Sequence, residues 1–207
     1  MLQLHHNSRV PEGQLARSAV FTVIDFETTG AVAGWLVEPW QIGMVVVRGG
    51  RVDRAEKFES LLRIDSGRPF NRHAPGRHAL LRDELAQSAT IGELWEKLSP
   101  WLIGRPLVAH NVGTERTILK KAAPLHKFGP WIDTLRIIRK LYPQHKSAAL
   151  DDLVREFGLL HRLNKICPGR APHDALYDAC ACAVLLEWLL AQNGWEQVTV
   201  KALMDLR

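Results

Sequence analysis

Apolar residues in the first third of the chain follow the pattern of β-strands. Residues 19–25 form an apolar, β-branched run, and residues 41–47 form a second one. A Gly-Gly pair at 49–50 marks a tight turn, after which the pattern resumes over residues 52–64. Because short connections join these three segments, we expect an antiparallel meander of three strands.

In the rest of the chain, short apolar strands alternate with segments of helical periodicity. We expect strands at residues 106–109 and 131–133, and an irregular loop at residues 65–77. Helices are expected at residues 91–102, 112–123, 134–141, 148–157, 174–192 and 198–206. Strands that alternate with helices favour parallel additions to a sheet. The pattern therefore predicts an α/β fold, with a mixed sheet flanked by helices.

Length and composition favour one globular domain. The chain has 207 residues, of which 46% are hydrophobic and 24% charged, enough to bury a proper core. We expect residues 1–17 to form a polar leader and residues 18–207 to form the single domain. No apolar run is long enough to cross a bilayer, and the first residues lack the features of a secretion signal. We therefore expect a cytoplasmic protein with no membrane partner.

The three cysteines agree with a reducing compartment. Cys167 stands alone, while Cys180 and Cys182 lie two residues apart on an expected helix and so point in different directions. We interpret all three as small core residues rather than as a disulfide or a zinc site.

The positive charge of the chain is concentrated in one region. The formal net charge is +5, and residues 116–146 carry eight Lys and Arg side chains with Asp133 as their only acid. Such a stretch is suited to a polyanion such as nucleic acid, although solvated helix faces are an equally ordinary explanation.

Two acidic side chains mark the end of the first strand. Asp25 and Glu27 are two residues apart, so alternation places both on one face and turns Phe26 toward the core. A pair of solvated acids where a strand leaves the core is the simpler explanation when this motif is taken alone.

Two further segments add acids and a histidine at expected helix starts. Asn111 is a good helix cap, which places Glu115 in the first turn. Pro172 is expected to keep His173 extended, so that Asp178 falls within the first two turns of the next helix. Acids are common at helix N-termini because of the helix dipole, so each segment alone also has a structural explanation.

Together the three segments suggest a catalytic metal site. Four carboxylates that converge repel one another unless cations lie between them. All three segments lie at strand ends or helix starts, where open α/β sheets bind their ligands. A histidine beside such a cluster is suited to accept a proton, a combination typical of two-metal phosphodiester cleavage.

These segments resemble the motifs of the DEDDh (DnaQ-like) 3′–5′ exonucleases, which include proofreading subunits of bacterial replicative polymerases such as DNA polymerase III. The resemblance spans residues 19–192 and includes the segments 107–111, 131–135 and 173–178, with a looser match at 78–85. It implies a ribonuclease-H-like α/β fold with a mixed five-stranded sheet of order 3-2-1-4-5.

The resemblance also implies roles for the acids and the histidine. Asp25 would bridge two divalent cations, Mg²⁺ or Mn²⁺, with Glu27 and Asp178 on the first metal and Glu115 on the second. His173 would remove a proton from the attacking water. The product would be a nucleoside 5′-monophosphate.

Substrate contacts are implied for a further set of residues near these motifs. They are Thr28, Gly30, His78 and Asn111. Trp35 and Trp40 are candidates for base stacking, although packing is the more common role of a tryptophan.

The second motif departs from the family pattern. The family usually has Asp where this chain has Glu115. The extra methylene moves the carboxylate by about 1.5 Å, and a misplacement of about 1 Å can lower a rate on the order of 100-fold. We expect an active enzyme whose second metal depends on substrate or favours Mn²⁺.

The leading interpretation is a 3′–5′ exonuclease that acts on single-stranded or frayed DNA ends. An exoribonuclease that trims RNA ends is the nearest alternative, and the altered second motif leaves open a catalytically weakened nucleic-acid-binding module. We expect residues 194–207 to cap the fold of a free-standing enzyme, with a homodimer or association with a polymerase left open.

Overall fold

The computed structural model describes residue 11 and residues 13–206. Its centre is a five-stranded sheet of order β3-β2-β1-β4-β5, as expected. The strands are β1 (Val20–Thr28), β2 (Pro39–Arg48), β3 (Arg51–Leu61), β4 (Leu107–Ala109) and β5 (Trp131–Asp133). The first three pair antiparallel, and β4 and β5 add in parallel beside β1.

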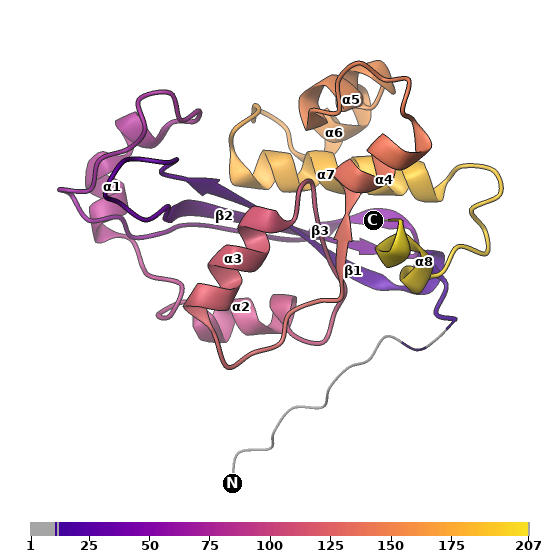
Figure 1. Cartoon of the computed structure of the whole chain (residues 1–207), viewed down its shortest axis with the longest axis horizontal. Coiled ribbons are helices and arrows are strands. Elements are labelled where there is room, and N and C mark those ends of the chain that lie inside the picture. The colour runs from indigo at the N-terminus through magenta and orange to yellow at the C-terminus, as the bar shows by residue number, and fades with distance from the viewer. Residues whose placement is uncertain (1–10, 12, 207) are drawn as a thin grey trace, which may run out of the picture.

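Helices cover both faces of this sheet (Figure 1). They are α1 (Arg82–Gln87), α2 (Trp95–Leu102), α3 (Gly113–Ala122), α4 (Thr134–Leu141), α5 (Leu150–Glu156), α6 (Leu160–Ile166), α7 (Ala175–Leu190) and α8 (Val200–Asp205). The bounds of β5 and α4 match the prediction, whereas α1 and α6 were not predicted. No helix within the described residues is both long and apolar enough to cross a membrane.

The alternation of side chains along β1 divides the core into two parts. Phe21 and Val23 face a large apolar cluster built around α7. Ile24 and Phe26 face the opposite way, into a cluster formed with α2 and α3. Asp25 therefore continues the α7 side of the sheet, with Phe26 buried on the other side as predicted.

The first turn of α7 lies directly against β2. Gly43 pairs with Asp25 in the register of the sheet. A Cβ at Gly43 would lie 2.2 Å from the carbonyl carbon of Ala175 and 2.3 Å from the amide nitrogen of Leu176. Only glycine leaves room for this approach, which brings the start of α7 beside the end of β1.

Gln41 fastens the same turn to the sheet. It lies opposite Glu27 and two residues from Gly43, on the same face of β2. Its Oε1 accepts a hydrogen bond from the Ala175 amide at 3.2 Å, and its Nε2 donates to Asp174 Oδ2 at 3.4 Å. Both groups that bond to this buried side-chain amide lie at the start of α7.

The end of the expected leader joins the domain. The Ala16 amide donates to the carbonyl of Val198 at 2.8 Å, and the Val200 amide donates to Gln14 at 2.9 Å. Ala16 is fully buried. Residues 14–16 therefore pack beside α8, while residues 1–10 and 12 of the expected leader lie outside the described residues.

Replacement of Gly43 by alanine tests the contact between β2 and α7. We expect Gly43→Ala to lower the free energy of unfolding by about 1–3 kcal/mol, because the added methyl meets backbone that cannot move without displacing α7. Urea unfolding measures this change. Gly92→Ala is the matched control, because a Cβ there meets its nearest atom only at 3.8 Å. Equal unfolding midpoints for the two variants would contradict the proposed close contact.

Candidate active site

A cavity of about 320 Å³ opens at the carboxyl end of β1. The sequence-predicted residues that line it are Asp25, Glu27, Thr28, Gly30, Asn111 and Glu115. They come from the end of β1 and the residues just after it, from the connection between β4 and α3, and from the first turn of α3. The carboxyl edge of parallel strands is where this class of sheet binds ligands.

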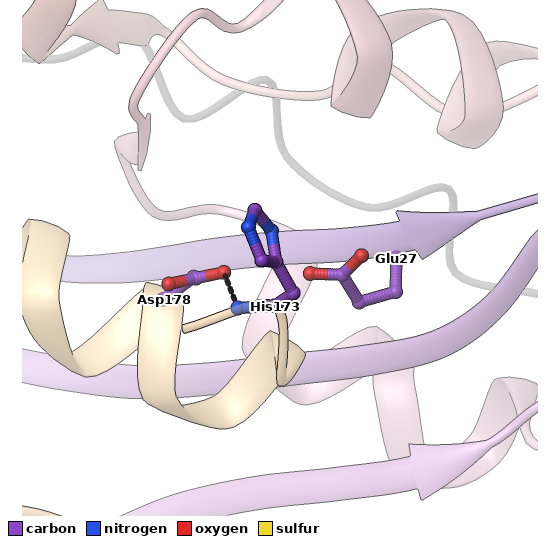
Figure 2. A group of neighbouring side chains, drawn as sticks. All are labelled: Glu27, His173 and Asp178. Atoms are coloured by element: carbon purple, nitrogen blue, oxygen red, sulfur yellow. Dashed lines mark hydrogen bonds between the residues drawn. The ribbon is translucent and has the colours of Figure 1, made fainter. Parts of the chain in front are cut away.

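Glu27, His173 and Asp178 meet at one side of this cavity (Figure 2). One potential ligand atom from each lies within 4.8 Å of the other two. The His173 amide donates to Asp178 Oδ2 at 3.0 Å. Glu27 is buried, Asp178 is partly buried and His173 is exposed, so the imidazole is the member that meets solvent.

The backbone of His173 differs from the prediction. We expected Pro172 to keep it extended, but its φ is +66°, in the left-handed region. This conformation is unusual for histidine and is found at sites where the surrounding structure imposes it. Here the turn lets His173 and Asp178 meet although they are five residues apart.

Asp25 lies within electrostatic reach of the other three acids. Burial raises the pKa of Asp25 well above its ordinary value, and the charges of Asp178, Glu115 and Glu27 raise it further, in that order. Asp25 also lines the cavity together with Glu27 and Glu115, and Glu27 meets Asp178 at its side. The structure therefore brings together the four acids that the sequence predicted.

Glu115 reaches this group from the first turn of α3. Its side chain is buried. Burial raises the pKa of Glu115 to about 7, although the nearby backbone amides of Glu115 itself and of Phe26 oppose this shift. Oε2 of Glu115 has no hydrogen-bond partner among the described residues.

Glu27 and Asp178 lie next to each other. Burial raises the pKa of Glu27 to about 8, and the negative charge of Asp178 adds to the rise. Burial also raises the pKa of Asp178 to about 6, although the His173 amide opposes this shift. Like charges held this close favour a shared proton unless a cation neutralises them.

The donor set fits divalent cations such as Mg²⁺ or Mn²⁺. These metals prefer carboxylate oxygens, and the site offers four carboxylates, one of which has an unpartnered buried oxygen among the described residues. The thiols of Cys167, Cys180 and Cys182 are free and buried, as predicted. Glu27 and Asp178 could hold one cation, Glu115 a second, and Asp25 both.

A network behind His173 holds the start of α7. Asp174 is the N-cap of the helix and accepts from the Tyr177 amide at 3.1 Å. The Arg170 guanidinium donates to both oxygens of Asp174, at 2.8 and 2.9 Å, and also to Glu59 on β3. These bonds tie the turn that carries His173 to the edge of the sheet.

Asp133 positions the start of α3, a role that the sequence analysis missed. Its Oδ1 accepts from the Asn111 amide at 3.1 Å, and its Oδ2 accepts from the Val112 amide at 3.3 Å. The same carboxylate caps α4 through the Leu135 amide at 3.0 Å. An acid at the end of a short strand, directly before a helical segment, was the available signal for this cap.

Asn111 lines the cavity but is not the helix cap that we predicted. The cap residue of α3 is Val112, and Asn111 has a φ of +77°. Asparagine is one of the few residues that tolerate this conformation. The left-handed turn directs the chain from β4 into α3 and leaves Asn111 at the cavity wall.

His78 lies outside the residues that line the cavity. Its ring is mostly buried and stacks on Phe70, with ring centroids 4.4 Å apart. Burial lowers the pKa of His78. Trp40, a candidate for base stacking, is 1% exposed and therefore offers no free face. The geometry gives both residues a packing role and does not place them against a substrate.

Several residues of the cavity wall were not predicted. They are Asn71, His73, Ala74, Pro75, His110 and Thr114. Asn71 fastens its loop to the end of β1, since its amide donates to Thr29 and its side chain donates to the Ala31 carbonyl, both at 2.8 Å. A loop rich in proline, glycine and histidine carries no periodic signal, so its position was visible only in the fold.

Comparison with known proteins identifies the family of this chain. The sequence profile of the RNase_T exonuclease family matches residues 22–186. The PolC-type DNA polymerase III of Bacillus cereus is 29% identical over 197 residues, which is 88% of this chain but only 12% of that polymerase.

Two solved structures share the fold. Exonuclease X in complex with 5′ overhanging duplex DNA has a TM-score of 0.63 and 24% identity, and covers 90% of this chain and 98% of its own. The nuclease domain of 3′hExo, a DEDDh family member bound to rAMP, has a TM-score of 0.67 and 16% identity, with coverages of 88% and 96%.

The chain therefore belongs to the RNase_T exonuclease family, whose members with this fold and motif set are DnaQ-like 3′–5′ exonucleases. The family is one of exonucleases, and the chain spans only 12% of the polymerase that it matches. The ribonuclease-H-like fold predicted from the sequence is confirmed. Membership of this family implies dependence on divalent metal ions.

The pH dependence of stability tests the crowded carboxylates. Their folded-state pKa values lie above those of exposed acids, so folding takes up protons, and metal-free protein should lose stability as pH rises from about 4 to about 8. Mn²⁺ should raise Tm more at pH 8 than at pH 5, because its ligands must be deprotonated.

The control for this experiment is Asp25→Asn, which removes the central charge. We expect the variant to gain Tm relative to wild type as pH rises in EDTA, and to gain less Tm from Mn²⁺. Differential scanning fluorimetry measures both quantities. A difference in Tm between the two proteins that stays constant from pH 5 to pH 8 would argue against mutual repulsion at this site.

Proposed function

We propose that this protein removes nucleotides one at a time from the 3′ end of single-stranded or frayed DNA and releases nucleoside 5′-monophosphates. The observation that carries the proposal is the convergence of Glu27, His173 and Asp178 within 4.8 Å, beside a cavity lined by Asp25 and Glu115. That is the residue set from which a two-metal phosphodiesterase site is built.

Two divalent cations would neutralise the phosphate oxygens and make a water molecule easier to deprotonate. The protein's own contribution is a fixed set of four acids, which repel one another unless cations lie between them. Glu27 and Asp178 lie on the side of His173, while Glu115 approaches from α3, so the two groups would hold different cations. Asp25, which lines the cavity together with Glu27 and Glu115, would serve both.

His173 is placed to act as the general base. Its side chain is exposed at the edge of the acidic group, whereas its backbone is held by Asp178. In this role the imidazole accepts the proton of the water that attacks the terminal phosphodiester. The bond to the 3′ oxygen of the preceding nucleotide breaks, so the phosphate stays on the released nucleoside.

Thr28, Gly30 and Asn111 are proposed to contact the terminal nucleotide, because all three line the cavity. Gly30 has a φ of +66°, and a Cβ there would lie 2.8 Å from that of Asn71. Glycine at this position therefore lets the loop that carries Asn71 pack against the residues at the end of β1. The fourth predicted contact, His78, has no such support from the geometry.

DNA is the favoured substrate because the relatives include PolC-type DNA polymerase III and the fold neighbours include Exonuclease X bound to DNA. RNA is the second candidate, since the 3′hExo domain of the same fold was solved with rAMP. Digestion of 5′-labelled DNA and RNA oligomers of one sequence separates the two. Association with a polymerase or a second copy of the chain stays a proposal.

Loss of the imidazole should slow the chemical step. We expect His173→Ala to lower kcat by about 100- to 10,000-fold while leaving KM nearly unchanged, because a general base acts mainly in the transition state. Release of dTMP from an oligodeoxythymidylate with Mg²⁺ or Mn²⁺ measures the rate. EDTA should abolish release in the wild type. Mononucleotide release that survives EDTA would contradict the metal mechanism.

The length of the Glu115 side chain should matter for the second cation. We expect Glu115→Asp to withdraw the carboxylate and to lower the rate on the order of 100-fold. Glu115→Gln keeps the length but removes the charge, and should weaken Mn²⁺ binding measured by calorimetry. If both variants kept the rate and the affinity of the wild type, Glu115 would not be a metal ligand.

A further inference from the structure

A second cavity, of about 520 Å³, lies beside the active-site cavity. Its walls are the segment 36–39 and one face of α3, and most of its lining is apolar. The lining residues that matter here are Leu36, Val37, Ile91, Thr114, Ile118 and Lys121. Thr114 lines both cavities, so the second one, which we call the apolar groove, adjoins the first at this residue.

One stripe of α3 forms the inner wall of the groove. Gly113, Thr117 and Lys121 follow one another at intervals of four residues, as does Ile118 after Thr114. The wall therefore begins with small residues next to the active site and ends with a cation. Lys121 is exposed, as is Lys120, which lies on α3 but does not line the groove.

The outer wall exposes large apolar side chains. Leu36 is 72% exposed and Val37 is 41% exposed, and the neighbouring Trp35 is 50% exposed. Three consecutive apolar residues at the surface, beside a groove, are typical of a binding surface rather than of solvated loop.

A buried arginine holds this outer wall in place. Arg68 is 1% exposed, and its guanidinium donates to Glu38 at 2.7 Å, to the Thr29 hydroxyl at 3.0 Å and to the Leu36 carbonyl. It also lies 5.1 Å from the centroid of the Trp35 ring. A buried arginine is costly unless it is fully bonded, so these contacts fix the backbone that presents the exposed side chains.

We propose that the apolar groove binds the nucleotides immediately upstream of the scissile bond in a single-stranded substrate. The inference rests on the proposed function. A nucleic-acid strand whose terminal phosphodiester lies at the carboxylates must leave the active-site cavity, and the groove adjoins that cavity at Thr114. Apolar walls accept base faces of any sequence, and Lys121 is suited to the phosphate backbone.

Two substrates separate this groove from the catalytic centre. The p-nitrophenyl ester of thymidine 5′-monophosphate needs only the active site, because it has no upstream nucleotide. A dT₈ oligomer would occupy the groove as well. We expect the double variant Leu36→Ser/Val37→Ser and the single variant Lys121→Ala to raise KM for dT₈ about 10-fold relative to KM for the ester, with kcat unchanged.

Matched controls come from exposed residues outside the groove. Leu125→Ser removes a leucine that is 95% exposed, and Lys120→Ala removes the neighbouring cation of α3. Both should leave KM for dT₈ as in the wild type. The effect of the groove variants should also shrink as the oligomer is shortened to dT₂, and the effect of Lys121→Ala should weaken at high salt.

The outcomes distinguish failure of the groove from failure of the proposed function. If the wild type hydrolyses the ester but the groove variants keep wild-type KM for dT₈, the groove proposal is wrong and the nuclease assignment stands. A change in sedimentation of the variants without a change in this KM would identify the groove as a contact between copies of the chain, and would also overturn the proposal.

Absence of ester hydrolysis with both Mg²⁺ and Mn²⁺ would count against the proposed function. The groove is then tested by binding alone, with fluorescein-labelled dT₈ in Ca²⁺. Weaker binding by the groove variants than by Leu125→Ser would support the groove, and equal binding would refute it.

Discussion

The contact between the first turn of α7 and strand β2 determines whether this site can exist. Asp25 and Glu27 belong to the end of β1, but Asp178 and His173 lie almost 150 residues later in the chain. They meet because Gly43, the partner of Asp25 in the sheet, has no side chain and lets the backbone of α7 touch β2. Gln41 then holds the start of α7 through one hydrogen bond to the Ala175 amide and one to the Asp174 carboxylate.

Because the four acids lie close together, their arrangement is unfavourable in the absence of cations. Burial raises the pKa of each of the four carboxyl groups, and their mutual repulsion adds to the effect at Asp25 and Glu27. A fold retains such an arrangement only when surrounding structure holds it, as the Asp174–Arg170 pair and the Asp133 cap do here. Cations are the natural counterpart, because they convert repulsion into attraction.

Rigid support extends from the acids to the surfaces around them. Asn71 ties one cavity loop to the end of β1, and Arg68 ties the segment of Leu36 to the neighbouring Thr29. The catalytic geometry and the proposed path of the nucleic-acid strand thus depend on the same few residues after β1.

Local patterns in the sequence predicted much of the architecture. Apolar runs and turns predicted the strands, helical periodicity predicted most helices, and the short segments around Asp25, Glu115 and Asp178 predicted the acids that the fold brings together. These features depend on neighbours in the chain, which a sequence displays directly. The left-handed turns at Asn111 and His173, the burial of His78 and the cavity loop around His73 depend on contacts between distant segments. The sequence by itself therefore determined which chemical groups are available, whereas only the tertiary structure decided which of them share one space, because packing of α7 and α3 against β1 sets distances that no local pattern contains.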